Sequence, residues 1–202
     1  MTDVLIVVAT LVLLAAVFLP TMSRRKLTRQ SRCASNIQQI GLAFRIWGTD
    51  GLDYPWMTSN NDGTRHFMES TNVFIRFRAA SNELSTPKIL VCPSDSGKKP
   101  AKDFNKFDNQ NISYFLGLEA DEGKPQTILS GDRNLSTNGV ALGSGVFTLT
   151  TNNALGWTAA IHKKSGNILL SDGSVQQVSP AALQKQWQAA SDQGAIGRLA
   201  IP

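Results

Sequence analysis

The sequence predicts an α+β protein in which one long amino-terminal α-helix packs on an antiparallel β-sheet, with small accessory helices. The first observation is an apolar run over residues 4–19, in which only Thr10 is weakly polar. The second is a pair of short apolar segments around Asp172-Gly173, a dipeptide that suits a two-residue hairpin turn. The third is a set of residues spaced 4, 3, 4 and 3 apart, on one face of a helix: Cys33, Ile37, Ile40, Phe44 and Trp47.

Residues 1–20 are predicted to form a transmembrane or N-terminal helix. The sixteen residues of the apolar run would span about 24 Å, somewhat less than the roughly 30 Å hydrocarbon core of a bilayer. Such a surface requires a membrane or an equally apolar bundle of helices. A cleaved signal peptide fits poorly, because Asp3 is the early charge and the basic residues follow the run. An ordinary single-pass anchor would place the basic flank, and hence the globular part, in the cytoplasm.

Residues 21–50 are predicted to form a basic, amphipathic helical stalk. Residues 21–47 contain six basic residues and no acidic ones, whereas residues 48–202 contain fourteen of each. The net charge of +5 therefore belongs to the stalk. Anionic headgroups or acidic residues of adjacent subunits are the expected partners of this charge, and nucleic acid is not expected, because no basic patch is interleaved with aromatic residues.

Residues 51–202 are predicted to form one globular domain, since about 150 residues can build a single core. Its composition favours loops and short strands. The expected elements are a short helix over residues 72–81 and strands over residues 88–92, 112–118, 126–129 and 146–150.

The final elements carry the clearest local signals. Residues 167–171 and 174–178 should pair as a hairpin across the Asp172-Gly173 turn. Ser179 and Pro180 then supply a helix cap and a first-turn proline for a helix over residues 181–190. These signals predict an antiparallel sheet followed by an accessory helix.

Several blocks of the chain follow one another in a recognisable order. An acidic residue precedes the apolar run, which ends at Leu19-Pro20 before a basic stretch and the segment 33–44 (Cys-Ala-Ser-Asn-Ile-Gln-Gln-Ile-Gly-Leu-Ala-Phe). This order resembles that of the type IV prepilins and the type II secretion pseudopilins. His162, nine intervening residues and Asp172-Gly173 match the His-x9-Asp-Gly group of prepilin-type proteins that is abundant in planctomycetes and verrucomicrobia. The segments 91–95 and 131–134 look like further blocks of this group.

The resemblance implies a pilin-like fold, a location in the inner membrane as a single-pass protein, and an extracytoplasmic (periplasmic) carboxyl-terminal domain. The implied partners are the membrane, other pilin-like subunits in a homo- or hetero-oligomer, and the secretion or pilus assembly machinery. The Gly-Phe-Thr-Leu stretch and the basic leader that a prepilin peptidase recognises are absent from the sequence. We therefore expect either a start codon placed too late or the loss of processing.

Asp3 falls where the family carries the glutamate that pairs with the amino-terminal amine of a neighbouring subunit. The resemblance thus implies an assembly role for Asp3, because a carboxylate near hydrocarbon is costly unless it is paired. The alternative is an acidic residue in the headgroup region with no such role.

His162 and Asp172 admit two interpretations. They could pair or bind a cation, and some pseudopilins carry calcium in a carboxyl-terminal loop, for which Asp132, Asn134 and Asp172 are the oxygen donors to consider. The simpler interpretation is that Asp172-Gly173 makes the turn while His162 packs beside the strand. No cofactor is expected, and calcium is the single candidate.

Cys33 and Cys92 are the only cysteines in the chain. In an extracytoplasmic domain they could form a disulfide. They could equally be two small buried residues.

The sequence lacks the patterns typical of enzymes. No serine lies in a Gly-x-Ser-x-Gly context, and no phosphate loop, dinucleotide fingerprint or zinc spacing occurs. We therefore expect a non-enzymatic, membrane-anchored pseudopilin subunit of a type II secretion or type IV pilus-like assembly. The alternative is a membrane-tethered extracytoplasmic binding module that keeps the fold without forming a filament.

Overall fold

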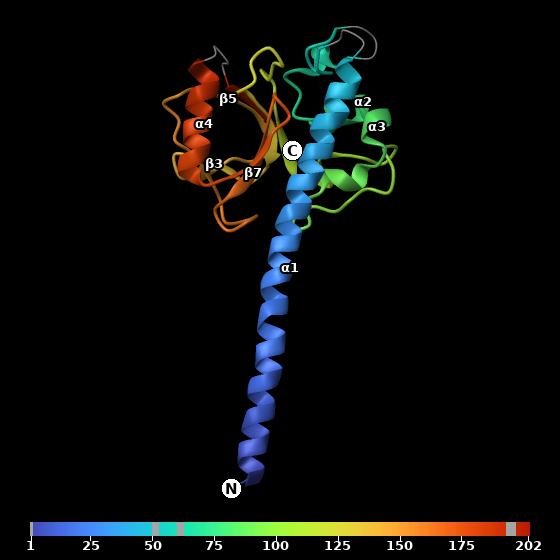
Figure 1. Ribbon diagram of the computed structural model, residues 1–202. Coiled ribbons are helices and arrows are strands. Elements are labelled where there is room, and N and C mark those ends of the chain that lie inside the picture. Colours follow the sequence, from blue (N-terminus) through green and yellow to red (C-terminus); the bar gives the residue numbers. More distant parts are fainter. Residues whose placement is uncertain (1, 50–52, 60–62, 193–196) are drawn as a thin grey trace.

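The computed structural model describes residues 2–49, 53–59, 63–192 and 197–202, but not the side chains of residues 2, 3, 5, 13 and 15–28. Helix α1 (Thr2–Gly48) projects from the rest of the chain, and its amino-terminal end lies far from the domain (Figure 1). Pro20 does not interrupt this helix. None of the helices in the described part of the chain combines the length and the apolar composition that crossing a membrane takes.

Six strands form the main sheet in the order β5-β9-β1-β2-β7-β8, and all of its pairings are antiparallel. The strand closest to the carboxyl terminus, β9, lies between β5 and β1, so the end of the chain is held inside the sheet. The strands are β1 (Tyr114–Gly117), β2 (Ile128–Asp132), β5 (Gly145–Leu149), β7 (Gly166–Leu170), β8 (Val175–Val178) and β9 (Gly197–Ile201).

A smaller sheet of three strands has the order β4-β3-β6 and lies near helix α4 (Pro180–Asp192) (Figure 1). Its strands are β3 (Leu135–Thr137), β4 (Val140–Ala141) and β6 (Leu155–Trp157). The remaining helices are short: η1 (Arg65–Phe67), α2 (Phe74–Ala79), α3 (Ser81–Leu84), η2 (Pro87–Leu90) and η3 (Asn109–Asn111).

The main sheet separates two apolar clusters, as strand β7 illustrates. Leu169 belongs to the cluster that includes Ile37 and Phe44 of α1, whereas Ile168 and Leu170 belong to the cluster that includes Trp187 of α4. Successive side chains of a strand point to opposite faces, so one sheet can serve two cores. Helices α2 and α3 lie on one side of α1, and the sheets lie on the other (Figure 1).

The predicted fold class, an α+β fold with a long N-terminal helix packed on an antiparallel sheet, is wrong. Apart from α1, the described chain is mainly antiparallel β-structure, with nine strands in two sheets and short helices around them. Helix α1 packs on the rest of the domain over only part of its length. Among its described side chains the first buried one is Cys33, and those before it are exposed or half-buried. The part of α1 that projects beyond the domain has no sheet to pack on, so the buried contacts of the helix come from residues 33–44.

Some of the predicted local elements of the domain are confirmed and one is wrong. The hairpin is confirmed by β7 and β8, and Gly173 adopts φ 86° in its turn. The carboxyl-terminal helix is confirmed by α4, in which Leu183, Trp187 and Ala190 are buried. The strand predicted over residues 88–92 is wrong, because a 3-10 helix, η2, occupies most of it. Strands β3, β4, β6 and β9 were not predicted.

Candidate functional site

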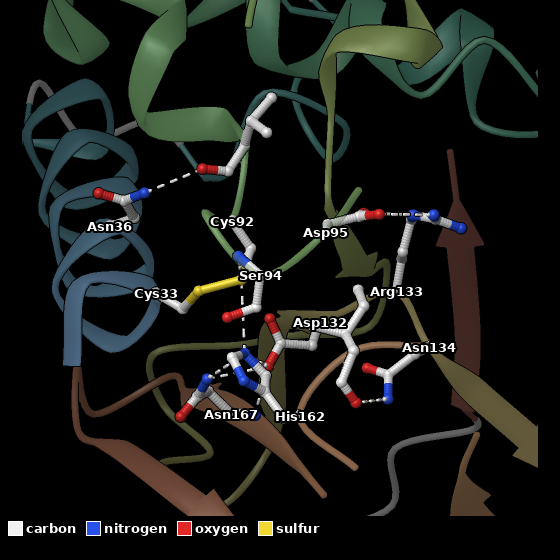
Figure 2. The surroundings of a disulfide bond; sticks show 12 residues. Cys33, Asn36, Cys92, Ser94, Asp95, Asp132, Arg133, Asn134, His162 and Asn167 are labelled. Atoms are coloured by element: carbon white, nitrogen blue, oxygen red, sulfur yellow. Dashed lines mark hydrogen bonds and ion pairs between the residues drawn. A yellow bond between two sulfur atoms is a disulfide. The ribbon is translucent and has the colours of Figure 1, made fainter. Parts of the chain in front are cut away.

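A disulfide joins Cys33 of α1 to Cys92, which follows η2, across 59 positions of sequence (Figure 2). Both cysteines are fully buried. Three residues after Cys33, the Asn36 side-chain amide donates a hydrogen bond to the carbonyl oxygen of Val91, at 3.1 Å. Two adjacent links therefore fix α1 to the segment around Cys92. The sequence did not decide whether Cys33 and Cys92 form a disulfide, and the structure shows that they do.

His162 lies directly beside the disulfide. Its Nε2 atom is 3.4 Å from the Sγ atom of Cys92 and 3.4 Å from the Oδ2 atom of Asp132. The His162 side chain is only 3% exposed. Figure 2 shows the imidazole close to both the disulfide and the Asp132 carboxylate. A histidine from the loop after β6 thus meets a cysteine tied to α1 and a carboxylate at the end of β2.

The loop that carries His162 has an unusual backbone. His162, Lys163 and Lys164 have φ values of 48°, 53° and 64°, so three consecutive non-glycine residues lie in the left-handed region. Each such residue costs on the order of 1 kcal/mol. The side-chain amide of Asn134 holds this loop, since its Nδ2 atom lies within 3.0 to 3.3 Å of the carbonyl oxygens of Thr158, Ile161 and Ser165. The segment 131–134 therefore positions His162.

Asp132, next to His162, is fully buried. Its Oδ2 atom accepts hydrogen bonds from the backbone N–H of Asn167, at 2.7 Å, and from the Asn167 side-chain amide, at 2.9 Å. The Oδ1 atom of Asp132 has no hydrogen-bond partner among the described residues. Strands β2 and β7 are neighbours in the main sheet, which is why Asp132 and Asn167 meet although 35 positions separate them.

Burial shifts both ionisable groups of this cluster toward their neutral forms. Burial raises the pKa of the Asp132 carboxyl from 3.8 to about 7, although its bonds from Asn167 act in the opposite direction. Burial also lowers the pKa of the His162 imidazole. Removing charge from water is costly, so the neutral forms of both groups are favoured.

A second carboxylate, Asp95, is held beside this cluster in ionised form. Its two oxygen atoms accept hydrogen bonds from Arg133 at 2.7 and 2.9 Å, and its side chain is 2% exposed. Burial alone would raise the pKa of Asp95, but the hydrogen bonds and charge of Arg133 outweigh it and leave that pKa below its usual value. This bidentate pair joins the segments 91–95 and 131–134 that the sequence singled out (Figure 2).

Asp172 and Gly173, by contrast, lie outside the cluster. Asp172 is exposed and its Oδ1 atom accepts a hydrogen bond from the backbone N–H of Ser174, at 2.7 Å. No hydrogen bond or ion pair joins it to His162 over the described ranges. Asp132 and Asn134 are buried, so the three oxygen donors considered for calcium do not converge. The interpretation of Asp172-Gly173 as a turn explains this geometry.

Sequence reasoning did not identify Asn167 as part of the site. The sequence feature that could have identified Asn167 is a polar residue near the start of an otherwise apolar strand. The structure shows that this position is fully buried. A buried polar side chain needs a partner, and here the partner is Asp132.

We expect the Asp132→Asn variant to lose a pH dependence that the wild type has. The folded state binds the Asp132 proton more tightly than the unfolded state does. The contribution of this proton to the free energy of unfolding is therefore fully present below about pH 4. It is lost as the pH rises through about 7. Relative to the variant, the wild type should lose about 3 kcal/mol of unfolding free energy between pH 4.5 and 8. Urea unfolding at several pH values would measure it.

His162 is present in both proteins of this comparison, so its own titration largely cancels from the difference. A constant difference in unfolding free energy over this pH range would show that Asp132 is ionised in the folded protein already at low pH.

The second candidate surface is the projecting part of α1. Asp3 lies in the first turn of this helix, and its side chain is outside the described part. Beyond the domain, described side chains that are apolar and large are between 52% and 68% exposed. They are Val4, Ile6, Val7, Val8, Leu11, Val12 and Leu14.

Models of protein families, curated proteins and solved structures were all compared with this chain, and none of them matches it.

Proposed function

We propose that this protein is a non-enzymatic structural subunit that assembles through α1, as a pseudopilin of a type II secretion system or of a type IV pilus-like assembly would. The observation that carries the proposal is the set of seven exposed apolar side chains on the projecting part of α1. Burying a Val, Leu or Ile side chain is worth about 1.5 to 3 kcal/mol. Covering all seven would therefore release on the order of 10 kcal/mol per chain, before the cost of association.

Copies of the same helix are the partner that this proposal assigns to the surface. The apolar side chains occur around the helix instead of on one stripe, since Ile6, Val7 and Val8 are consecutive and all exposed. A helix that is apolar all round is buried on all sides. A bundle of parallel helices provides such surroundings, and Asp3 would then lie close to the first turn of a neighbouring copy.

The location that goes with this proposal is the inner membrane, with a single membrane-anchored helix and the domain on the extracytoplasmic side. The Cys33–Cys92 disulfide supports this side, because disulfides persist in oxidising compartments and are rare in the cytosol. The exposed Arg29 and Arg32 of α1 would meet anionic headgroups or acidic groups of adjacent subunits.

Removing residues 1–28 tests this function. The full chain should require detergent and form complexes larger than one chain, whereas the shortened chain should be a monomer in water. Light scattering coupled to size-exclusion chromatography would measure both masses, and circular dichroism would show that the domain remains folded. Association of the shortened chain to the same degree would place the assembly surface elsewhere. A full chain that is monomeric in mild detergent would favour the tethered binding module.

A further inference from the structure

The disulfide and His162 together have the composition of a metal site. The two sulfur atoms of Cys33 and Cys92 and one ring nitrogen of His162 all lie within 4.8 Å of one another. Two cysteines and a histidine are ligands that Zn²⁺ binds in structural sites. Their sequence spacing gives no sign of this, because the three residues come from α1, from the segment after η2 and from the loop after β6.

We propose that, when the disulfide is reduced, Cys33, Cys92 and His162 bind a zinc-class divalent cation. Zn–S bonds of about 2.3 Å and Zn–N bonds of about 2.0 Å place a sulfur and a nitrogen ligand about 3.5 Å apart in a tetrahedral site. The distance of 3.4 Å between Cys92 Sγ and His162 Nε2 already matches this sulfur–nitrogen separation. The proposal does not depend on the assembly role of α1.

The two sulfur atoms must separate for the ion to enter. They are covalently bonded in the disulfide, whereas two thiolates on one tetrahedral Zn²⁺ are about 3.8 Å apart. Rotation of the two cysteine side chains and a small shift of α1 would provide the difference. The segment around Cys92 would then remain bridged to α1 by the metal instead of by the covalent bond.

Asp132 supplies the second observation that points to a ligand here. Its Oδ1 atom is buried and has no partner within the described part of the chain, although such an atom normally finds one. Its Oδ2 atom lies 3.4 Å from His162 Nε2, which is longer than a typical hydrogen bond to nitrogen. A cation bound to His162 would place positive charge next to this carboxyl. A metal-bound Nε2 carries no proton to donate, so Asp132 would act as the fourth ligand or as a neighbouring negative charge, and not as an acceptor from that atom.

The chemistry balances with a phosphine as the reductant. A trialkylphosphine and water convert the disulfide into two thiols, and the phosphine is oxidised to its oxide. Zn²⁺ then displaces the two thiol protons and binds the thiolates. The oxidised protein keeps both sulfur atoms in the S–S bond, so the disulfide and the metal-bound form exclude each other. Calcium is not expected, because it takes oxygen ligands.

Cobalt(II) provides a direct spectroscopic test on the full chain in mild detergent. After phosphine reduction, Co²⁺ should bind with one ion per chain and give a thiolate-to-cobalt charge-transfer band and the visible bands of a tetrahedral ion. Zn²⁺ should displace it. The oxidised protein and the reduced Cys33→Ser variant should show neither signal. Absence of these bands from the reduced, folded wild type would overturn the proposal.

His162→Gln and His66→Gln form a matched pair of variants, since His66 is the other histidine of the chain and is exposed. His162→Gln should weaken Zn²⁺ binding by at least about 100-fold, which exceeds the usual cost of losing only an outer partner. His66→Gln should bind as the wild type does. Equal affinities for the two variants would exclude His162 as a ligand.

A further measurement covers the case in which reduction unfolds the domain. Zn²⁺ added before the phosphine should then preserve the circular dichroism signal of the wild type, and Mg²⁺ at the same concentration should not. Loss of the signal in both samples would contradict the proposal.

Discussion

Replacing Cys33 and Cys92 together by alanine is expected to lower the free energy of unfolding by about 4 kcal/mol. The disulfide closes a loop with a sequence separation of 59 residues, and the chain-entropy model assigns a loop of this length about 4 kcal/mol at 25 °C. Both cysteines are fully buried, so alanine avoids placing an unpaired hydroxyl in the core. Since a typical domain stability is about 5 to 15 kcal/mol, this one change would remove roughly a quarter of it or more.

Urea unfolding of the full chain in mild detergent would measure the loss, with a chelator present to remove metal ions. The fluorescence of Trp56, Trp157 and Trp187, which are all buried, reports on the core. The wild type reduced by a phosphine under the same conditions should lose a similar amount. A decrease below about 1 kcal/mol in the double variant would show that Asn36 and the apolar contacts of α1 hold the helix without the disulfide.

The double variant Val8→Glu, Leu11→Glu is expected to abolish assembly. Val8 and Leu11 are three residues apart on α1, on one face of the helix, and both are more than half exposed. A carboxylate in an apolar bundle or near hydrocarbon costs several kcal/mol unless it is paired. Two such groups in every copy should reduce the assembled fraction by more than about 100-fold. Sedimentation of the protein in mild detergent would measure that fraction.

Val140→Glu is the matched control for this experiment. Val140 lies on β4, is 69% exposed and belongs to the domain. The control introduces the same charge at a similarly exposed apolar residue, so it should assemble as the wild type does. Normal assembly of the Val8→Glu, Leu11→Glu variant would show that the projecting part of α1 has no role in association.

The parts of the fold that the sequence predicts correctly are those that local chemistry determines. Asp172-Gly173 permits the positive φ of a tight turn, so the hairpin follows from residues within one short segment. The helix over residues 181–190 likewise follows from Pro180 at its start and from the spacing of its apolar residues. In both cases the neighbours in sequence are also the neighbours in space.

The strand predicted over residues 88–92 shows where local reasoning fails. The apolar residues there suggested a strand, but Pro87 and the Thr86 hydroxyl, which accepts a hydrogen bond from the backbone N–H of Lys88, begin a 3-10 turn. The disulfide then holds Cys92 against α1 instead of in a sheet. Pro87 cannot donate to a ladder, which is the physical reason that a turn is favoured at this point.

The candidate site was predicted in pieces and not as a whole. His162 and the segments 91–95 and 131–134 were singled out, but their convergence depends on the pairing of β2 with β7 and on the docking of α1. Asp132 and Asn167 are 35 positions apart in sequence, and no local pattern determines which strands become neighbours. Of the two interpretations of His162 and Asp172, the structure agrees with the turn, because Asp172 is exposed and accepts a hydrogen bond from Ser174.

The most direct test of the proposed assembly is photo-crosslinking in intact cells. A photoreactive amino acid at Leu11 of the full chain should give a series of crosslinked products containing two or more copies of the protein. The same amino acid at the exposed Lys88 of the domain should give far fewer. If Leu11 yields only single chains, or crosslinks to lipid alone, then α1 does not bring copies of this protein together.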